Sequence, residues 1–160
     1  ILLLGKGLGG GVFPLAAMLA RAEFDRFPEL AIGHVTHEKS SVGCAAALAV
    51  LDVFQEEDLC GRARRLGQLA LARLRQQLAG HPLVAEVRGL GMQWAVELRR
   101  PDGRAAVAEA ESVLYACLAR GLSFKIGQGS TLVLGPPLTI SEAELARGLF
   151  IFEEAIKRLA

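Results

Sequence analysis

The sequence predicts an α/β protein, and two observations support this prediction. The chain has 160 residues, of which 52% are apolar, and this is enough for a domain with a real core. Its hydrophobic pattern changes along the chain: a strand and a glycine-rich loop come first, two long helices follow, and a strand–helix–strand–helix unit ends the sequence. This order of elements is typical of a mixed α/β layout.

The first element is a strand followed by a tight loop. Residues 1–4 form a continuous apolar run that ends at a glycine, as expected of a buried parallel strand. The loop runs from Gly5 to Gly11 and carries Lys6. Three further segments, an apolar stretch, a short helix and a loop, are predicted over residues 13–19, 22–27 and 28–39.

Two long helices are predicted in the middle of the chain. Ser40 or Ser41 is suited to cap the first helix, which covers residues 42–55. The second helix covers residues 59–79, where leucines recur on one face, and it ends at Gly80.

The last third of the chain alternates strands and helices. Apolar and polar residues alternate from Met92 to Leu98, which predicts a half-buried strand. A helix, two short strands around a glycine turn, and a final helix follow. Ser141 and Glu144 are spaced as a capping box at the start of that final helix. The predicted ranges of the middle helix and the two strands are residues 105–120, 123–126 and 131–135.

Charge and hydropathy exclude two classes of partner. The 18 basic and 17 acidic side chains give a formal charge of +1, whereas nucleic-acid binding needs a basic face or stripe. Arg62, Arg64 and Arg65 do cluster, but acidic residues precede them, so we expect a solvated helix face there. No apolar run approaches the roughly 18–20 residues that span a bilayer. We therefore expect neither a nucleic-acid nor a membrane partner.

The cysteines indicate neither a metal site nor disulfides. Cys44, Cys60 and Cys117 are widely spaced, and no Cys-x-x-Cys pair occurs. Reduced cysteines in a cytoplasmic protein are the expectation. The chain also opens on an apolar strand without an initiating methionine, so we expect it to be the C-terminal part of a longer protein.

The glycine loop fits two chemistries. The first is dinucleotide binding, because Gly5, Gly7 and Gly10 match G-x-G-x-x-G directly after a strand. Gly11 and Pro14 argue against it, since both disfavour the helix that should face the phosphates. A Walker loop is excluded, because Gly7 occupies the position after the lysine, where serine or threonine is required.

The second chemistry is Schiff-base catalysis by Lys6. A lysine amine becomes nucleophilic when desolvation or a nearby positive group lowers its pKa. Flanking glycines let a flat cofactor approach the backbone and give the side chain room to swing. A surface lysine in a glycine turn is the non-functional alternative, and local chemistry alone leaves all three possibilities open.

Longer motifs relate this loop to a known family. Four of them occur in order, at residues 4–15, 33–36, 87–91 and 134–140. They resemble four segments of class III pyridoxal-phosphate aminotransferases, also called the omega-aminotransferase or ornithine-aminotransferase-like family. In the same order, these segments are the lysine segment, the loop before the long helix, the entry to the C-terminal domain and the late "P-P-L" segment. Each motif is weak alone, and their order and spacing carry the resemblance.

The resemblance implies the C-terminal portion of a fold-type I enzyme. Residues 1–56 correspond to the end of the cofactor-binding large domain, and residues 57–160 to the small C-terminal α/β domain. Lys6 falls on the catalytic residue that forms the Schiff base with pyridoxal 5'-phosphate. Thr36 falls on the residue that binds the cofactor phosphate, contributed by the neighbouring subunit. A homodimer with shared active sites is therefore expected.

The resemblance also implies a reaction. It is the transfer of an amino group between an amine or amino acid and a keto acid or aldehyde. Racemases and decarboxylases share the fold type, so transamination is an expectation at the level of the family. The family's aspartate for the pyridine nitrogen, its stacking aromatic residue and its glycine-rich phosphate loop lie upstream of the lysine, so the site in this chain is expected to be incomplete.

One departure bears on the substrate. Many members that bind an α-carboxylate carry an arginine three residues before the first proline of the late segment, and Val133 stands there. An amine, an omega-amino acid, or a carboxylate bound elsewhere becomes more plausible. Lys125 or Arg88 could then supply the compensating cation, and Lys125 is the candidate substrate-binding residue.

Two alternative functions remain on the sequence alone. One is a fragment of a dinucleotide-binding oxidoreductase that uses Gly5, Gly7 and Gly10. The other is a non-catalytic assembly module that packs against a separate N-terminal chain.

Overall fold

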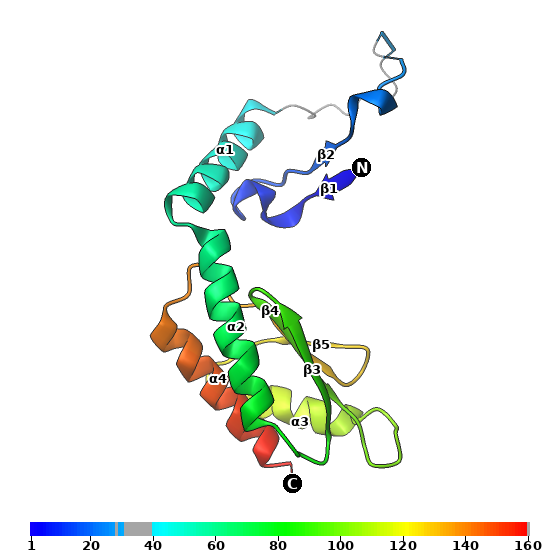
Figure 1. The fold of residues 1–160 in the computed structure, drawn as a ribbon, viewed down its shortest axis with the longest axis vertical. Helices are drawn as coiled ribbons and strands as arrows, with labels where there is room; N and C mark the ends of the chain where they lie inside the picture. Colours follow the sequence, from blue (N-terminus) through cyan, green and yellow to red (C-terminus); the bar gives the residue numbers. More distant parts are fainter. Residues whose placement is uncertain (28, 31–39, 160) are drawn as a thin grey trace. The chain divides into compact units, whose positions relative to one another are not determined.

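The computed structural model describes residues 1–27, 29–30 and 40–159. The chain divides into two compact units, which we call unit 1 (Ile1–Asp58) and unit 2 (Leu59–Ala160). Their helices and strands are labelled in Figure 1. Both kinds of element occur, so the predicted mixed α/β class is confirmed.

Unit 1 contains a small antiparallel sheet. Its two strands, β1 (Leu2–Leu4) and β2 (Ala17–Leu19), pair in register from Leu2 opposite Leu19 to Leu4 opposite Ala17. The prediction of a buried parallel strand at the start of the chain was wrong, because the β1 side chains are exposed. The physical reason is the short connection: a glycine-rich turn can reverse the chain, whereas parallel neighbours need a crossover of a dozen residues or more.

Unit 1 also contains helical segments. η1 (Lys6–Gly9) and η2 (Ala22–Phe24) are single turns of 3-10 helix, and α1 (Ser41–Glu56) is a long α-helix. The Ser40 hydroxyl accepts a hydrogen bond from the Gly43 amide at 3.4 Å, so the predicted serine cap is confirmed. A Cβ at Gly43 would lie 3.0 Å from the Phe13 ring, and glycine therefore lets α1 approach the segment that follows the lysine loop.

Unit 2 is a four-stranded antiparallel sheet with three helices. The strand order is β3-β4-β6-β5, with strands β3 (Val84–Leu90), β4 (Gln93–Leu98), β5 (Lys125–Gly127) and β6 (Thr131–Leu134). The helices are α2 (Leu59–Gln77), α3 (Val107–Leu118) and α4 (Glu142–Lys157). The predicted capping box of α4 is confirmed, because Ser141 and Glu144 exchange both hydrogen bonds.

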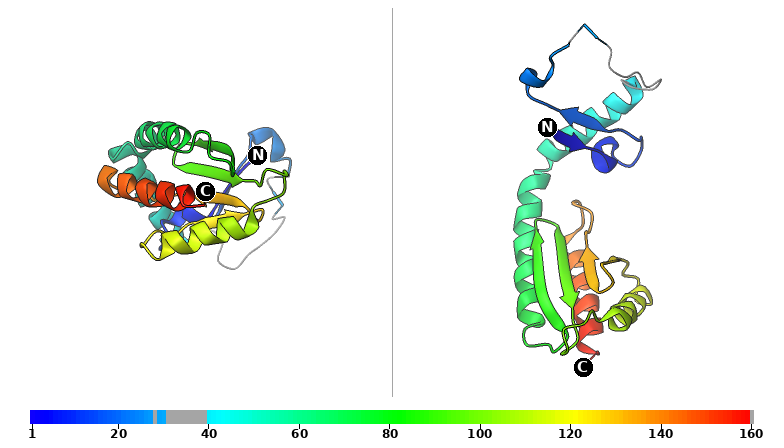
Figure 2. Two further views of the ribbon diagram at one scale, coloured as in Figure 1. Left: turned by 90° about the horizontal axis from the view of Figure 1, so that it is seen from below. Right: turned by 90° about the vertical axis from the view of Figure 1, so that its right-hand side faces the viewer.

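The helices of unit 2 lie on one face of its sheet. Side chains alternate along β4, so that Trp94, Val96 and Leu98 are at most 1% exposed while their neighbours are at least partly accessible. Helices α2 and α3 contact the strands, and Figure 2 shows them with α4 on the same side. The opposite face of the sheet, which carries Ala95 and Glu97, is not covered by these helices.

The core of unit 2 is continuous across the sheet and the helices. The ring of Phe124 meets Phe152 of α4 edge-on, with their centroids 5.4 Å apart. One glycine governs how closely α2 approaches the sheet: a Cβ at Gly67 would lie 2.1 Å from the Gly91 carbonyl oxygen in the turn between β3 and β4. Any side chain at Gly67 would push the helix away from this turn.

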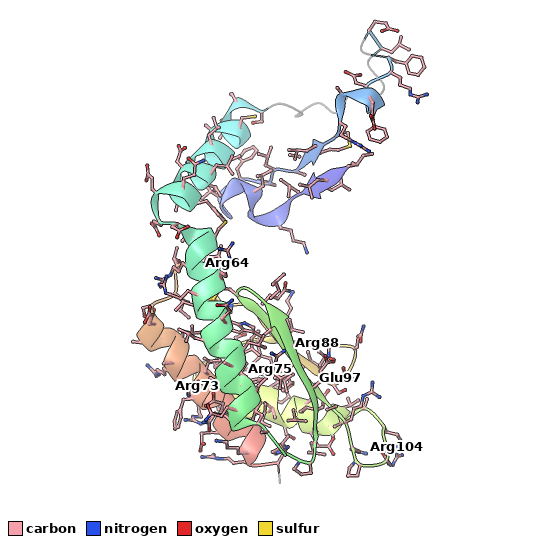
Figure 3. The ribbon with its side chains drawn as sticks, viewed as in Figure 1. Arg64, Arg73, Arg75, Arg88, Glu97 and Arg104 are labelled. Atoms are coloured by element: carbon pink, nitrogen blue, oxygen red, sulfur yellow. The ribbon has the colours of Figure 1, made fainter. Side chains whose placement is uncertain are left out.

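A buried ion pair joins α2 to α4. The Arg73 guanidinium donates two hydrogen bonds to the Glu153 carboxylate, Nε to Oε1 at 2.7 Å and an η nitrogen to Oε2 at 2.8 Å. Glu153 is 3% exposed, whereas the Arg73 side chain is 34% exposed. Figure 3 labels Arg73 on the long helix. The hydrogen bonds that Arg73 donates to Glu153 raise the pKa of Arg73, so the guanidinium stays charged in the fold.

Cys117 makes the stability of unit 2 sensitive to alkaline pH. It is fully buried in α3, and this burial raises the pKa of its thiol from the ordinary 9.0 to about 11. As the pH rises, the Cys117 thiol therefore ionises in the unfolded chain before it does so in the folded one. The free energy of unfolding keeps this contribution below pH 9 and falls by about 2–3 kcal/mol between pH 9 and 11. Urea unfolding at stepped pH should show this loss in the wild type and lack it in Cys117→Ala. The same decline in both proteins would disprove the role of Cys117.

Within the described residues, no helix is both long enough and apolar enough to cross a membrane.

Candidate functional site

Lys6 has an unusual backbone conformation. It begins η1 with a φ of 52°, in the left-handed region that non-glycine residues rarely adopt. Such a conformation costs on the order of 1 kcal/mol and is held in place by its surroundings. Glycine would adopt it freely, and glycine flanks this position on both sides. Lys6 therefore occupies a backbone position that glycine would fill without this cost.

The loop around Lys6 is fixed by its own hydrogen bonds. The Leu8 amide donates to the Gly5 carbonyl at 3.3 Å, and the Gly10 amide donates to the Gly7 carbonyl at 3.0 Å. Gly10 has a φ of 67°, and a Cβ added to it would lie 2.9 Å from Val50 of α1. The loop therefore meets α1 at a point where only glycine fits.

The Lys6 side chain is available for chemistry. Lys6 is exposed, and its ammonium makes no ion pair with any described carboxylate of the chain. A primary amine that is neither neutralised nor covered can react with the aldehyde of a cofactor. Thr36, the predicted phosphate-binding residue, lies outside the described residues.

The geometry after the loop disfavours dinucleotide binding. That fingerprint requires an α-helix whose N-terminus faces the phosphates. Here η1 ends at Gly9 after four residues, and the chain then enters β2, antiparallel to β1. The three glycines at positions 5, 7 and 10 thus shape a turn around Lys6.

Lys125, the predicted substrate-binding residue, lies in unit 2 at the start of β5. It is exposed and pairs with Val133 of β6. Both residues line a cavity of about 450 Å³ whose wall is largely apolar. The other wall residues include Gln93 and Trp94 of β4, and Leu149 of α4.

Arg88, the other candidate cation, is already neutralised. One of its η nitrogens donates to Glu86 at 2.6 Å and to Glu97 at 2.9 Å. Figure 3 labels Arg88 and Glu97 on the neighbouring strands β3 and β4. The hydrogen bond from Arg88 lowers the pKa of Glu97, as does that from Arg99, so the carboxylate stays ionised beside it. The charge of Arg88 is therefore used to hold β3 and β4 together.

Arg62 was expected on a solvated helix face, and the structure gives it a different role. Its guanidinium donates to the carbonyl of Leu138 at 3.1 Å and also to the carbonyl of Ile140. These bonds tie α2 to the segment after β6, which carries Pro136 and Pro137 of the cavity wall. Charge patterning could not reveal this role, because the partners are backbone carbonyls far away in the sequence.

Comparison with known proteins identifies the class. The sequence model of the family described as aminotransferase class-III matches residues 1–156. The chain therefore belongs to the class-III aminotransferase family, whose enzymes depend on pyridoxal phosphate. The predicted family and the fold-type I architecture are confirmed.

Individual relatives differ in their chemistry. The chain is 42% identical to the (R)-1-hydroxy-2-aminoethylphosphonate ammonia-lyase of Vibrio splendidus, covering 99% of this chain and 34% of that enzyme. It is 38% identical to the leucine/methionine racemase of Thermococcus litoralis, covering 98% of this chain and 35% of that enzyme. The solved ornithine aminotransferase of Toxoplasma gondii, which shows partial occupancy of pyridoxal phosphate (PLP) at its active site, matches this chain with a TM-score of 0.88. The identity is 29%, and the match covers 98% of this chain and 36% of that one.

The chain spans about a third of the length of the curated relatives it matches.

Proposed function

We propose that the complete protein is a pyridoxal-phosphate-dependent enzyme that removes the amino group of a primary amine and transfers it to a keto acid or aldehyde. The single observation that carries this proposal is Lys6, whose exposed amine makes no ion pair with a described carboxylate and whose strained backbone lies in a glycine turn. The chemistry of this residue fits the cofactor, since a primary amine is the group that reacts with the pyridoxal aldehyde.

The cofactor, when bound, supplies the electron sink for the carbon that bears the amino group. Lys6 would hold the cofactor through its side-chain amine. When that amine is free, it would take a proton from the substrate carbon that bears nitrogen and return it to a neighbouring atom, as a general base and acid. A lysine suits both steps because its ammonium can lose its proton, which an arginine cannot do in a protein.

The remaining assignments follow from the family. Thr36 is proposed to bind the cofactor phosphate of a neighbouring subunit in a homodimer. Residues 1–56 are proposed to close the large cofactor-binding domain, and residues 57–160 to form the small domain. The protein is proposed to be cytoplasmic, and amines or amino acids are its proposed substrates.

A second candidate function is release of the amino group as ammonia. The 42% identical relative is a phosphonate ammonia-lyase, and Val133 stands where an α-carboxylate-binding arginine is expected in many members of the family. Both observations favour a substrate without an α-carboxylate. The two functions share the role of Lys6 and differ in the fate of the nitrogen.

Measuring which product receives the amino nitrogen distinguishes these functions. The complete enzyme would be incubated with 2-aminoethylphosphonate, (R)-1-hydroxy-2-aminoethylphosphonate or 5-aminovalerate, with and without pyruvate. Transamination predicts alanine that appears only when pyruvate is present. Ammonia elimination predicts free ammonia at the same rate in both conditions. If neither alanine nor free ammonia formed from any amine of a panel that also includes α-amino acids, the proposed function would be contradicted.

A further inference from the structure

Helix α1 packs directly against the loop that carries Lys6. Within unit 1 it contacts η1, and the two elements lie side by side in Figure 1. A Cβ added to Gly10 would lie 2.9 Å from Cγ2 of Val50, well inside the 3.5–4.0 Å at which carbon atoms normally meet. The Val50 side chain, which is partly buried, therefore bears on the loop four residues after Lys6.

A second contact joins α1 to the chain that leaves this loop. A Cβ added to Gly43 would lie 3.0 Å from the Phe13 ring and 3.2 Å from Cδ1 of Leu15. Gly43 is buried, and Phe13 and Leu15 are partly buried. Gly43 and Val50 are about two helical turns apart, so they lie on the same face of α1. One face of this helix thus supports both the loop and its exit.

The backbone of Lys6 depends on such support. Its φ of 52° costs on the order of 1 kcal/mol and persists only where the surroundings hold it. Two short turns, closed by the Leu8 and Gly10 amides, fix it from within the loop. A glycine-rich segment has many other conformations open to it, so these turns alone define it weakly. The contact with Val50 limits the loop from outside.

We propose that Val50 and Gly43 of α1 are positioning residues that hold Lys6 in its strained conformation and thereby set where its amine can reach. Val50 acts through Gly10, and Gly43 acts through Phe13. This inference rests on the proposed function, in which the Lys6 amine must reach both the cofactor and the substrate carbon. A displacement of about 1 Å in a reacting group can cost about 10²-fold in rate. The effect belongs to kcat, because neither residue is proposed to contact the substrate.

The first test loosens the support in the complete enzyme. Val50→Ala removes the methyl group that faces Gly10, and kcat should fall about 10-fold while the KM for the amine changes by less than about 2-fold. Val50→Ile keeps that methyl group and should retain most of the wild-type kcat. The matched control is Val42→Ala, which removes the same two methyl groups from α1 where the side chain is 63% exposed, and it should match the wild type.

The second test pushes the support outward. Gly43→Ala places a Cβ against the Phe13 ring, and it should also lower kcat. Its matched control is Gly148→Ala in α4, where the added Cβ would meet Leu122 at an ordinary 3.6 Å. Both substitutions favour their helices to the same degree, so only the steric effect differs. Adding Phe13→Leu to Gly43→Ala removes the ring and should restore part of the lost kcat.

Amide hydrogen exchange reports the loop without cofactor or substrate. In both α1 variants the Leu8 and Gly10 amides should exchange about 10-fold faster than in the wild type, because their turns open more often. Unchanged exchange together with unchanged kcat would overturn the inference, as would faster exchange with unchanged kcat. An equal fall in kcat in Val42→Ala would overturn it as well, because the effect would then be a general weakening of α1.

Failure of the proposed function would be seen separately. A wild-type enzyme that converts no amine would overturn that function whatever the variants do. The amount of cofactor that borohydride fixes to Lys6 would then test the positioning. It should be lower in Val50→Ala and Gly43→Ala than in the wild type, and equal amounts would overturn the inference.

Discussion

Replacing Lys6 by alanine in the complete enzyme is expected to lower turnover about 10³-fold or more, because we propose that this one side chain both holds the cofactor and moves the proton. The structure supports this expectation: the residue occupies a left-handed conformation within a hydrogen-bonded glycine turn, and its amine is exposed. Alanine at this position would keep the same backbone strain without the amine. Steady-state rates with saturating amine and acceptor would measure the effect.

Two further variants make this test specific. Lys6→Arg keeps the positive charge but cannot lose its proton, so it should be as inactive as Lys6→Ala. Lys157→Ala removes a lysine whose ammonium only bonds Gln77 on the surface, and it should retain wild-type turnover. Near-normal rates in Lys6→Ala, with cofactor bound, would contradict the catalytic role.

Replacing Arg73 by methionine is expected to destabilise unit 2 by on the order of 3 kcal/mol, because the Glu153 carboxylate would remain buried without its partner. Methionine is similar in length to the arginine stem, so packing is largely kept. Urea unfolding of the chain, followed by the fluorescence of its single tryptophan, Trp94, would report the loss at the centre of the sheet.

A double variant separates the charge effect from a packing effect. In Arg73→Met combined with Glu153→Leu, no charge stays buried, and stability should return to within about 1 kcal/mol of the wild type. A double variant as unstable as Arg73→Met would show that the ion pair is not the cause.

Periodicity predicted the three helices of unit 2 and its strands β4, β5 and β6, but it did not predict β3 (Val84–Leu90). The final helix was expected from its capping box and its apolar stripe, and both Leu149 and Phe152 are buried as expected. These patterns depend on residues three or four apart, which a sequence shows directly. The direction of β1 was not predictable in the same way, because pairing with β2 depends on how the intervening loop turns.

The site was predictable only in part. Lys6 could be selected from its glycines and from the family's motifs, but its left-handed conformation could not. The roles of Arg62 and Arg88 depend on partners brought close by tertiary packing and strand register, so charge patterning did not indicate them. The pairing of Lys125 with Val133 likewise became visible only through the register of β5 and β6.

Lys6 is the residue that we propose to hold the cofactor. Borohydride reduction of the complete enzyme with pyridoxal phosphate, followed by proteolysis and mass spectrometry, tests it directly. We expect the mass of the reduced cofactor on the peptide that contains Lys6, and its absence from the same peptide in the Lys6→Arg variant. An active wild-type enzyme that carries the adduct on another lysine, or carries none, would contradict the claim.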